Sequence, residues 1–153
     1  MPDDWEQARE VRILALTSDP ITFCSSVEKE RQLTESDWRR RLTESYTVLG
    51  WNGRIPVATA TGKVDQHETG AREMVGVWLD PSSRGTDAAS RLVKEIIDWA
   101  RVERATALSL WVMENNVRAK RFYQRIGFVE TGEKEEAKPG VYEVRMKRAF
   151  NYA

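Results

Sequence analysis

The sequence has few of the residues on which several classes of protein depend. It contains one histidine, His67, and one cysteine, Cys24. A single histidine does not support a histidine-based metal cluster or a Ser-His-Asp triad, and a single cysteine forms no internal disulfide. No apolar run approaches the roughly 20 residues that span a bilayer. We therefore expect a cytoplasmic protein without a metal ion and without a membrane partner.

An excess of charge of one sign is also missing. Lys and Arg together number 24, as do Asp and Glu, so no overall basic field would attract nucleic acid. The start of the chain, MPDDWEQARE, is acidic and polar and does not resemble a signal peptide. No repeat or linker-like stretch divides the 153 residues. The composition, 41% apolar and 31% charged, predicts one globular domain over residues 1–153.

Local patterns predict helices at the start of the chain. Apolar residues recur at three-to-four spacing over residues 5–18, which predicts an amphipathic helix that stops before Pro20. Thr34, with Asp37 three residues later, predicts a capping box at the start of a short helix that ends at Leu42. Both helices would precede the first strand.

The rest of the chain alternates between strands and helices. Two β-prone runs flank Asn52-Gly53, a pair that tight turns prefer, and they predict a hairpin over 46–64. The further elements expected, in order, are a polar turn at 65–70, a strand at 71–80, a helix at 86–103, a strand at 107–113, a helix at 116–125, a strand at 128–131, a charged loop at 132–140 and a strand at 141–148. This order predicts an α/β (α+β) fold, with a single mixed, mostly antiparallel sheet of about six to seven strands and helices on both faces.

One connection has the features of an anion-binding loop. LDPSSRGTDAASRLVKEIIDWA, residues 79–100, runs from a strand end to a helix N-terminus, where unpaired N–H groups and the helix dipole favour a phosphate. Arg84 adds a cation that pairs well with phosphate oxygens, whereas Asp87 adds a carboxylate. The alternative is an ordinary β–α turn in which Gly85 supplies an unusual φ and Arg84 is solvated.

Together with the segment that follows, this loop resembles a known family. VWLDPSSRGTDAASRLVKEIIDWA and LSLWVMENNVRAKRFYQRIGF are similar to the GNAT superfamily of acyl-CoA N-acyltransferases. The phosphate loop of that family reads Arg/Gln-x-x-Gly-x-Gly/Ala, and Arg84 to Ala89 aligns with it; NNVRAKRFYQRIGF, residues 115–128, resembles a second hallmark. The resemblance implies a GNAT-like fold, acetyl-CoA as cosubstrate, a primary amine as acceptor and N-acetyl transfer as the reaction.

The same resemblance assigns residues to the cosubstrate. The strand that ends near Leu79 would part from its neighbour at LWV, and the pantetheine arm would insert between them. The implied cofactor-binding residues are Val77, Trp78, Leu79, Arg84, Gly85, Thr86, Asp87, Ala88, Ala89, Asn116 and Arg118. At Asp87 the family usually has glycine. A carboxylate that faced the pyrophosphate would weaken binding, whereas one that pointed to solvent would not.

Two residues are candidates for the chemistry. The resemblance places Tyr123 beside the thioester sulfur as a general acid, and a purely core aromatic is the alternative. Glu73 is the candidate general base, on the same side of its strand as Val75, Val77 and Leu79 if alternation holds. The alternatives are a solvated Glu73, Glu114 in its place, or ordered water without a dedicated base.

Other residues have structural roles as their simplest interpretation. His67 lies in a polar turn and is expected at the surface. Asn115 or Asn116 is expected to cap the helix that follows. The acceptor pocket is expected to come from the N-terminal helices, the 65–70 turn and the 132–140 loop.

Two further hypotheses remain open at this point. Asp87 and the uncertain base allow an acyl-CoA-binding sensor or scaffold with little or no activity. A plain α/β domain that pairs with a partner is the other. The family usually opens with a strand before its first helix, whereas this chain enters that helix by about residue 4. An exposed sheet edge would then offer a route to a homodimer.

Overall fold

The computed structural model describes residues 2–18, 27–84 and 87–152. Gly85 and Thr86, two of the predicted cofactor-binding residues, lie outside these ranges, as does Cys24. In chain order the helices and strands are α1 (Trp5–Ser18), α2 (Val27–Arg31), α3 (Glu35–Glu44), β1 (Tyr46–Asn52), β2 (Ile55–Val64), β3 (Arg72–Leu79), α4 (Ala88–Val102), β4 (Ala107–Met113), α5 (Val117–Ile126), β5 (Val129–Lys138) and β6 (Val141–Ala149). None of the described helices is long and apolar enough to cross a membrane.

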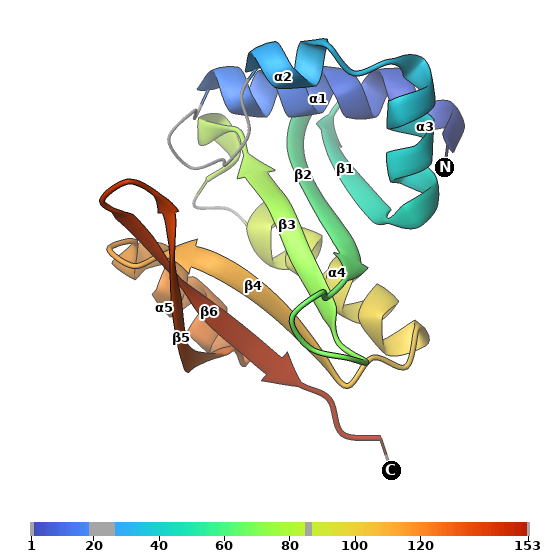
Figure 1. Ribbon diagram of the computed structural model, residues 1–153. Coiled ribbons are helices and arrows are strands. Elements are labelled where there is room, and N and C mark those ends of the chain that lie inside the picture. The colour runs from blue at the N-terminus through green and yellow to red at the C-terminus, as the bar shows by residue number, and fades with distance from the viewer. Residues whose placement is uncertain (1, 19–26, 85–86, 153) are drawn as a thin grey trace.

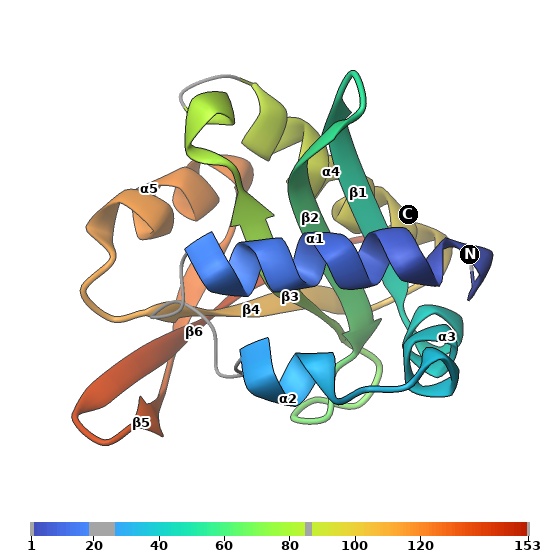
Figure 2. The same ribbon diagram turned by 90° about the horizontal axis from the view of Figure 1, so that it is seen from above.

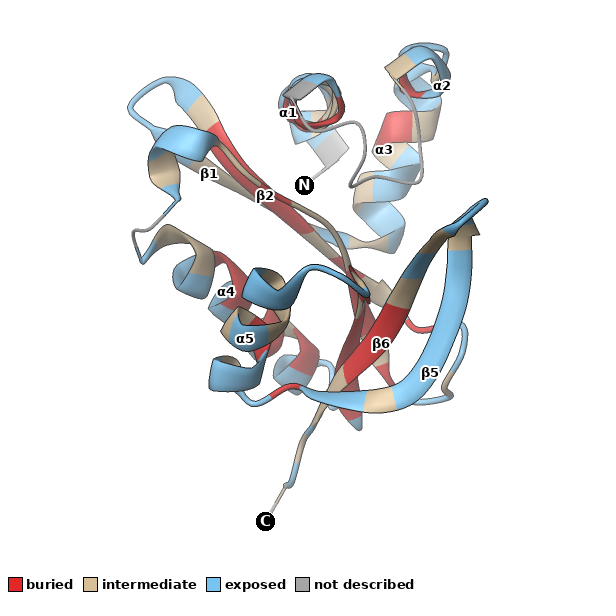
Figure 3. Cartoon of the chain, turned by 90° about the vertical axis from the view of Figure 1, so that its left-hand side faces the viewer, coloured by how far each residue is buried: buried red, intermediate tan, exposed pale blue. Residues whose placement is uncertain are grey.

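The described strands form one six-stranded sheet in the order β1-β2-β3-β4-β6-β5. β3 and β4 pair in parallel, and every other neighbouring pair is antiparallel. Figures 1 and 3 show α1, α2 and α3 on one face of the sheet and α4 and α5 on the other. We call these the α1 face and the α4 face. The predicted mixed, mostly antiparallel sheet with helices on both faces is confirmed.

The sheet is covered by a core on each face. The main core lies on the α4 face, where the buried side chains of α4 are Leu92, Val93, Ile96, Ile97 and Ala100. They pack with Phe128 and with the inward-facing side chains of the central strands. On the α1 face, Val11 and Leu16 of α1 pack against Trp78 of β3. Figure 2 shows α1 crossing the first three strands.

Local signals set the ends of these elements as predicted. In the capping box of α3, the Thr34 N–H donates to Oδ2 of Asp37 at 2.9 Å, and the Asp37 N–H donates to Oγ1 of Thr34 at 3.1 Å. β1 ends at Asn52, so the predicted hairpin is confirmed. α5 ends at Gly127, whose φ of 106° is the left-handed conformation common at helix C-termini.

The predicted charged loop at 132–140 is wrong, because most of it is strand. β5 extends to Lys138 and pairs with β6 along its length, with shifts of register between Glu130 and Lys134 and between Glu136 and Lys138. Its side chains are mostly exposed, so no alternation of polar and apolar residues marks it. Charged side chains are typical of an edge strand, since they prevent pairing with other chains.

β1 forms the opposite edge of the sheet. Among the described residues no strand precedes it, which agrees with the expected absence of an opening strand in this part of the chain. Pairing of two chains through this edge stays a prediction.

Candidate active site

The parallel strands β3 and β4 stay together over a short distance only. They pair at Arg72 with Leu108 and at Glu73 with Ser109, and beyond these residues the ladder ends. Figure 1 shows the two strands diverging towards their C-terminal ends. In open α/β sheets, ligands bind outside the C-terminal ends of the strands. The parting of β3 and β4 is therefore the place where the sheet is open to a ligand.

A β-bulge lies in β3 just after this point. Thr61 is opposite Val75 and Thr59 is opposite Trp78, so Ala60 alone faces two residues of β3. Gly76, one of these two, has a φ of 62°, a conformation that glycine adopts without the steric cost that a Cβ brings. The bulge reverses the alternation of side chains along the strand.

This reversal corrects the predicted neighbours of Glu73. Val77 and Leu79 pack against the main core, on the α4 face. Glu73 lies opposite Lys63 of β2, and residues opposite each other in a ladder share a face. Since Lys63 lines a cavity on the α1 face, Glu73 also belongs to that face. The expectation that Glu73 shares a side with Val77 and Leu79 is wrong, because regular alternation does not account for the bulge.

Glu73 is a buried carboxyl at the last paired position before the strands part. It is 8% exposed. Burial raises its pKa above the ordinary glutamate value, against the charge of Lys63, which lowers it. Asp65 raises this pKa further, whereas His67 and Arg145 lower it. A carboxyl with a raised pKa is better matched to taking a proton near neutral pH than an ordinary glutamate is.

A buried ionic network supports this position from β4 and β6. The Arg145 Nη2 and the Ser109 hydroxyl both donate to Oδ2 of Asp65, each at 2.7 Å. Burial alone would raise the pKa of Asp65, but hydrogen bonds from Ser109, the His67 N–H and Arg145 outweigh it and hold this pKa below its ordinary value. Sequence analysis missed the network, because its members are far apart in the chain.

Tyr123 lies on the other side of the sheet. It belongs to the α4-face core, and its ring meets Phe122 at 5.2 Å and Phe128 at 5.7 Å, both edge to face. Burial raises its pKa to about 12, so the hydroxyl is neutral at pH 7 and can donate. In the described part of the chain this hydroxyl has no hydrogen-bond partner. Tyr123 is thus a buried core aromatic with one neutral polar atom.

The described residues of the predicted phosphate loop lie at the start of α4. Arg84 is exposed, and its Nε donates to the carbonyl oxygen of Leu79 at 3.3 Å. Asp87 occupies the N-cap position of α4, is exposed, and makes no capping hydrogen bond through its side chain. Ala88 and Ala89 form the first turn and are half-buried.

The start of α5 lies next in the chain after β4. Asn116 is the N-cap, and its side-chain oxygen accepts from the Ala119 N–H at 3.1 Å. The prediction that Asn115 or Asn116 caps this helix is therefore confirmed for Asn116. Arg118 is exposed in the first turn.

Two alternative candidates for proton transfer have other partners. Glu114 is exposed and forms an ion pair with Lys134 at 2.7 Å. His67 is exposed, and its ring meets Trp111 edge to face at 5.7 Å. In the described ranges no group of three or more His, Cys, Asp or Glu side chains is arranged to hold a metal ion.

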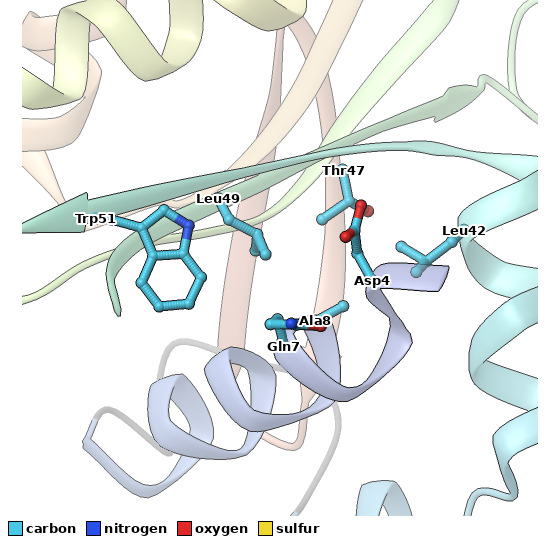
Figure 4. A pocket seen from close by; sticks show the side chains of 7 residues that line it. All are labelled: Asp4, Gln7, Ala8, Leu42, Thr47, Leu49 and Trp51. Atoms are coloured by element: carbon cyan, nitrogen blue, oxygen red, sulfur yellow. The ribbon is translucent and has the colours of Figure 1, made fainter. Parts of the chain in front are cut away.

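Two cavities adjoin on the α1 face. The larger, about 630 Å³, is lined by Ala8, Arg12, Glu30, Trp38, Arg41, Leu42, Glu44, Ser45, Thr47, Thr59, Thr61, Lys63, Val64, Gln66, Val75 and Gly76; we call it the main cavity. The smaller, about 290 Å³, shares Ala8, Leu42 and Thr47 with it and is closed by Asp4, Gln7, Leu49 and Trp51 (Figure 4). Residues of the N-terminal helices and Gln66 of the 65–70 turn line the main cavity; that the acceptor binds there stays a prediction. None of the described residues of 132–140 lines either cavity.

The sheet topology and the parting of its central strands agree with the GNAT-like fold that the sequence resemblance implies. Residues 9–128 match the model of the Acetyltransferase (GNAT) family. This match covers more than half of the 153 residues, and the chain belongs to the GNAT acetyltransferase family. A comparison of the sequence with curated proteins gave no match.

Solved structures show the same fold at low sequence identity. The protein yncA of Salmonella typhimurium, with acetyl-CoA, has a TM-score of 0.75 and 14% identity over 100% of this chain and 92% of its own. PaiA N-acetyltransferase of Thermoplasma acidophilum, with coenzyme A, has a TM-score of 0.71 and 13% identity over 98% and 95%. A Bacillus anthracis protein assigned as a streptothricin acetyltransferase, with acetyl-CoA, has a TM-score of 0.62 and 17% identity. The match includes 71% of the residues of this chain and 64% of the residues of the Bacillus anthracis protein.

Proposed function

We propose that this protein transfers an acetyl group from acetyl-CoA to a primary amine, directly and within a ternary complex. The observation that carries the proposal is the parting of β3 from β4 immediately after Glu73. A buried carboxyl lies there on the α1 face, and the buried hydroxyl of Tyr123 belongs to the α4 face. Family membership and structures of the same fold that contain acetyl-CoA or coenzyme A support the choice of cosubstrate.

The residues present fit acetyl-CoA as this cosubstrate. Beyond Glu73, the backbone of β3 has no ladder partner on the β4 side, so its polar groups remain available to an amide-containing arm such as pantetheine. Arg84 and the N-terminus of α4 lie where β3 ends, and together they would hold the pyrophosphate. Asp87 is exposed there, which leaves its carboxylate hydrated and lessens its repulsion of the phosphates.

Each chemical step then has a residue. Glu73 takes a proton from the attacking ammonium, directly or through one water, and frees the lone pair of the nitrogen. A backbone N–H near Leu79 donates to the carbonyl oxygen of the acetyl group, where negative charge develops. The C–S bond breaks as the C–N bond forms, and the Tyr123 hydroxyl donates its proton to the departing thiolate. The new amide nitrogen loses its second proton, which returns the Tyr123 phenolate to its neutral form through solvent. Asn116 and Arg118 at the start of α5 would add contacts to the cosubstrate.

Acetyl-CoA should stabilise the folded protein and be consumed only when an amine is present. At 100 times the dissociation constant, binding adds about 2.7 kcal/mol to the free energy of unfolding, which for a domain of this size raises Tm by about 5–10 °C. Thermal unfolding measures this shift, and release of free CoA thiol across a panel of primary amines measures transfer. A shift without thiol release would support the sensor hypothesis, for which the carboxylate of Asp87 in the phosphate loop is the argument. No shift and no release would contradict both.

Tyr123→Phe should lower kcat by about tenfold while leaving the Kd for acetyl-CoA unchanged. General acids contribute larger factors in many reactions, but a thiol ionises near pH 8.5, so the thiolate is a good leaving group even without a donor. The hydroxyl makes no hydrogen bond within the described residues, and its loss should not affect Tm. Tyr142→Phe, at an exposed tyrosine of β6, is the matched control. Weaker binding with unchanged kcat would show that Tyr123 is not the acid.

A further inference from the structure

We propose that the amine acceptor carries an oxyanion, a carboxylate or a phosphonate, which binds the arginines of the main cavity while its amine reaches Glu73. This inference rests on the proposed function and names the class of its second substrate. The main cavity, at about 630 Å³, has the size of small-molecule sites. Glu73 does not line the cavity, but its neighbours Lys63 and Val75 do. The cavity is therefore the compartment next to the base.

One wall of this cavity is built around one buried carboxylate and two arginines. Glu30 of α2 is 2% exposed. Its Oε1 accepts from Nε of Arg12 at 3.3 Å, and its Oε2 accepts from Nη1 of Arg41 at 2.8 Å. Both guanidinium groups share this one carboxylate. Counted together, the three side chains have one more positive than negative charge at the cavity wall.

The two guanidinium groups are held in place. A Cβ built on Gly76 would lie 3.2 Å from Nη1 of Arg12, so this guanidinium lies directly against the bulge in β3. The guanidinium of Arg41 lies over the ring of Trp38, 4.9 Å from its centroid, a favourable cation–π arrangement. Planar guanidinium groups match the geometry of carboxylate and phosphonate oxygens. Their position against the bulge brings the excess charge close to the strand that carries Glu73.

The remaining polar lining agrees with a small amphoteric acceptor. Thr47 and Thr61 line the floor with their hydroxyl oxygens 3.1 Å apart, and hydroxyls both donate and accept. Lys63 adds a third cation and Glu44 a second acidic side chain, and both Arg41 and Glu44 are exposed. A polycationic acceptor would meet this wall with like charges. An acceptor with one amine and one oxyanion would place opposite charges at both ends.

Matched pairs of acceptors test this inference. Each pair contains an amino carboxylic acid or an aminophosphonic acid and the same amine with the acid replaced by a neutral amide or by hydrogen. We expect the acid-bearing member of at least one pair to have a kcat/KM for thiol release about 10-fold to 100-fold higher. Isothermal titration of the same compounds should show the same order of affinity, and this measurement does not depend on turnover. The two acid arms identify which oxyanion is bound.

Variants of Arg41 provide the controls. In Arg41→Gln the preference for the acid should fall to about threefold or less, whereas Arg41→Lys should retain most of it. Arg39→Gln, on the same helix but paired with Asp3 and Glu35 outside the cavity, should leave the preference intact. Equal or better use of neutral amines or diamines by the wild type would overturn the inference and leave the acetyltransferase proposal standing. If no amine is acetylated, that proposal fails, and the titration alone decides between acid and neutral ligands.

Discussion

Glu73→Gln is expected to lower kcat by about 100-fold to 10,000-fold, the usual contribution of a general base, while the Kd for acetyl-CoA stays within about threefold. Glutamine has nearly the same shape as glutamate and cannot take the proton of the amine. Steady-state kinetics of thiol release with the preferred amine measures the loss, and calorimetric titration with acetyl-CoA measures binding. Because Glu73 lies on the α1 face and the cosubstrate residues follow the bulge, the two readouts should separate.

The pH dependence provides an independent check of the same assignment. Burial raises the pKa of Glu73, and only the deprotonated carboxylate acts as a base. As pH falls through this raised pKa, kcat/KM of the wild type should therefore fall, starting above the range of an ordinary glutamate, about 4.3. The acidic limb should be missing from Glu73→Gln. A raised pKa also means that folding disfavours the charged form, so stability decreases as pH rises through this window. The glutamine variant should thus be at least as stable as the wild type at pH 7.

Glu114→Gln is the matched control for this experiment. Glu114 follows the end of β4, is exposed and is paired with Lys134, and its substitution should change kcat by less than about twofold. A larger loss in Glu114→Gln than in Glu73→Gln would move the role of the base to Glu114. Equal and small losses in both would favour ordered water.

Asp65→Ala should lower the free energy of unfolding by about 3–5 kcal/mol, the usual cost of breaking a buried ion pair from one side. The substitution removes the 2.7 Å partner of the Arg145 guanidinium, which is 3% exposed, and leaves it with Glu133 at 2.9 Å and Glu68 at 3.7 Å. It also removes the acceptor of the Ser109 hydroxyl. Such a loss is a large part of the 5–15 kcal/mol that stabilises an ordinary domain. Urea unfolding followed by circular dichroism measures it.

The pH dependence of stability distinguishes an ionic contribution of Asp65 from a contribution of side-chain packing alone. The pKa of Asp65 is held below its ordinary value, so its contribution is present above the unfolded pKa of about 3.9 and is lost as pH falls through the lower, folded pKa. Below that range, wild type and Asp65→Ala should converge in stability. Lys94→Ala, which removes an exposed pair with Asp98, should cost no more than about 1 kcal/mol. If Asp65→Ala also lowered the free energy of unfolding by no more than about 1 kcal/mol, the ionic network of Asp65 would not stabilise the junction of β3 and β4.

The sequence predicted those features that depend on neighbouring residues. The capping box at Thr34 and the hairpin at Asn52-Gly53 are each specified within a few positions. The helix at 86–103 was predicted for the same reason, since one helix face repeats every three to four residues. Caps, turns and helix faces can be predicted from the sequence because they depend on residues that are close together in the chain.

What the sequence did not predict depends on the partners of a strand or on distant contacts. A glycine inside a strand, such as Gly76, is one signal of a bulge, but the sequence does not show the pairing that defines it, in which Ala60 faces two residues of β3. β5 was missed because both of its faces are mostly polar and its identity as a strand depends on β6. Arg12, Glu30 and Arg41 come from three helices, and no spacing in the sequence links them.

The bulge also divides the chain in two. The described residues that line the two cavities all lie at or before Gly76, and every residue assigned to acetyl-CoA lies after it. Substitutions before Gly76 can therefore change which acceptor is bound without changing the residues proposed to bind acetyl-CoA, which follow Gly76. The bulge thus lies at the boundary between the residues proposed for the acceptor and the residues proposed for the acyl donor.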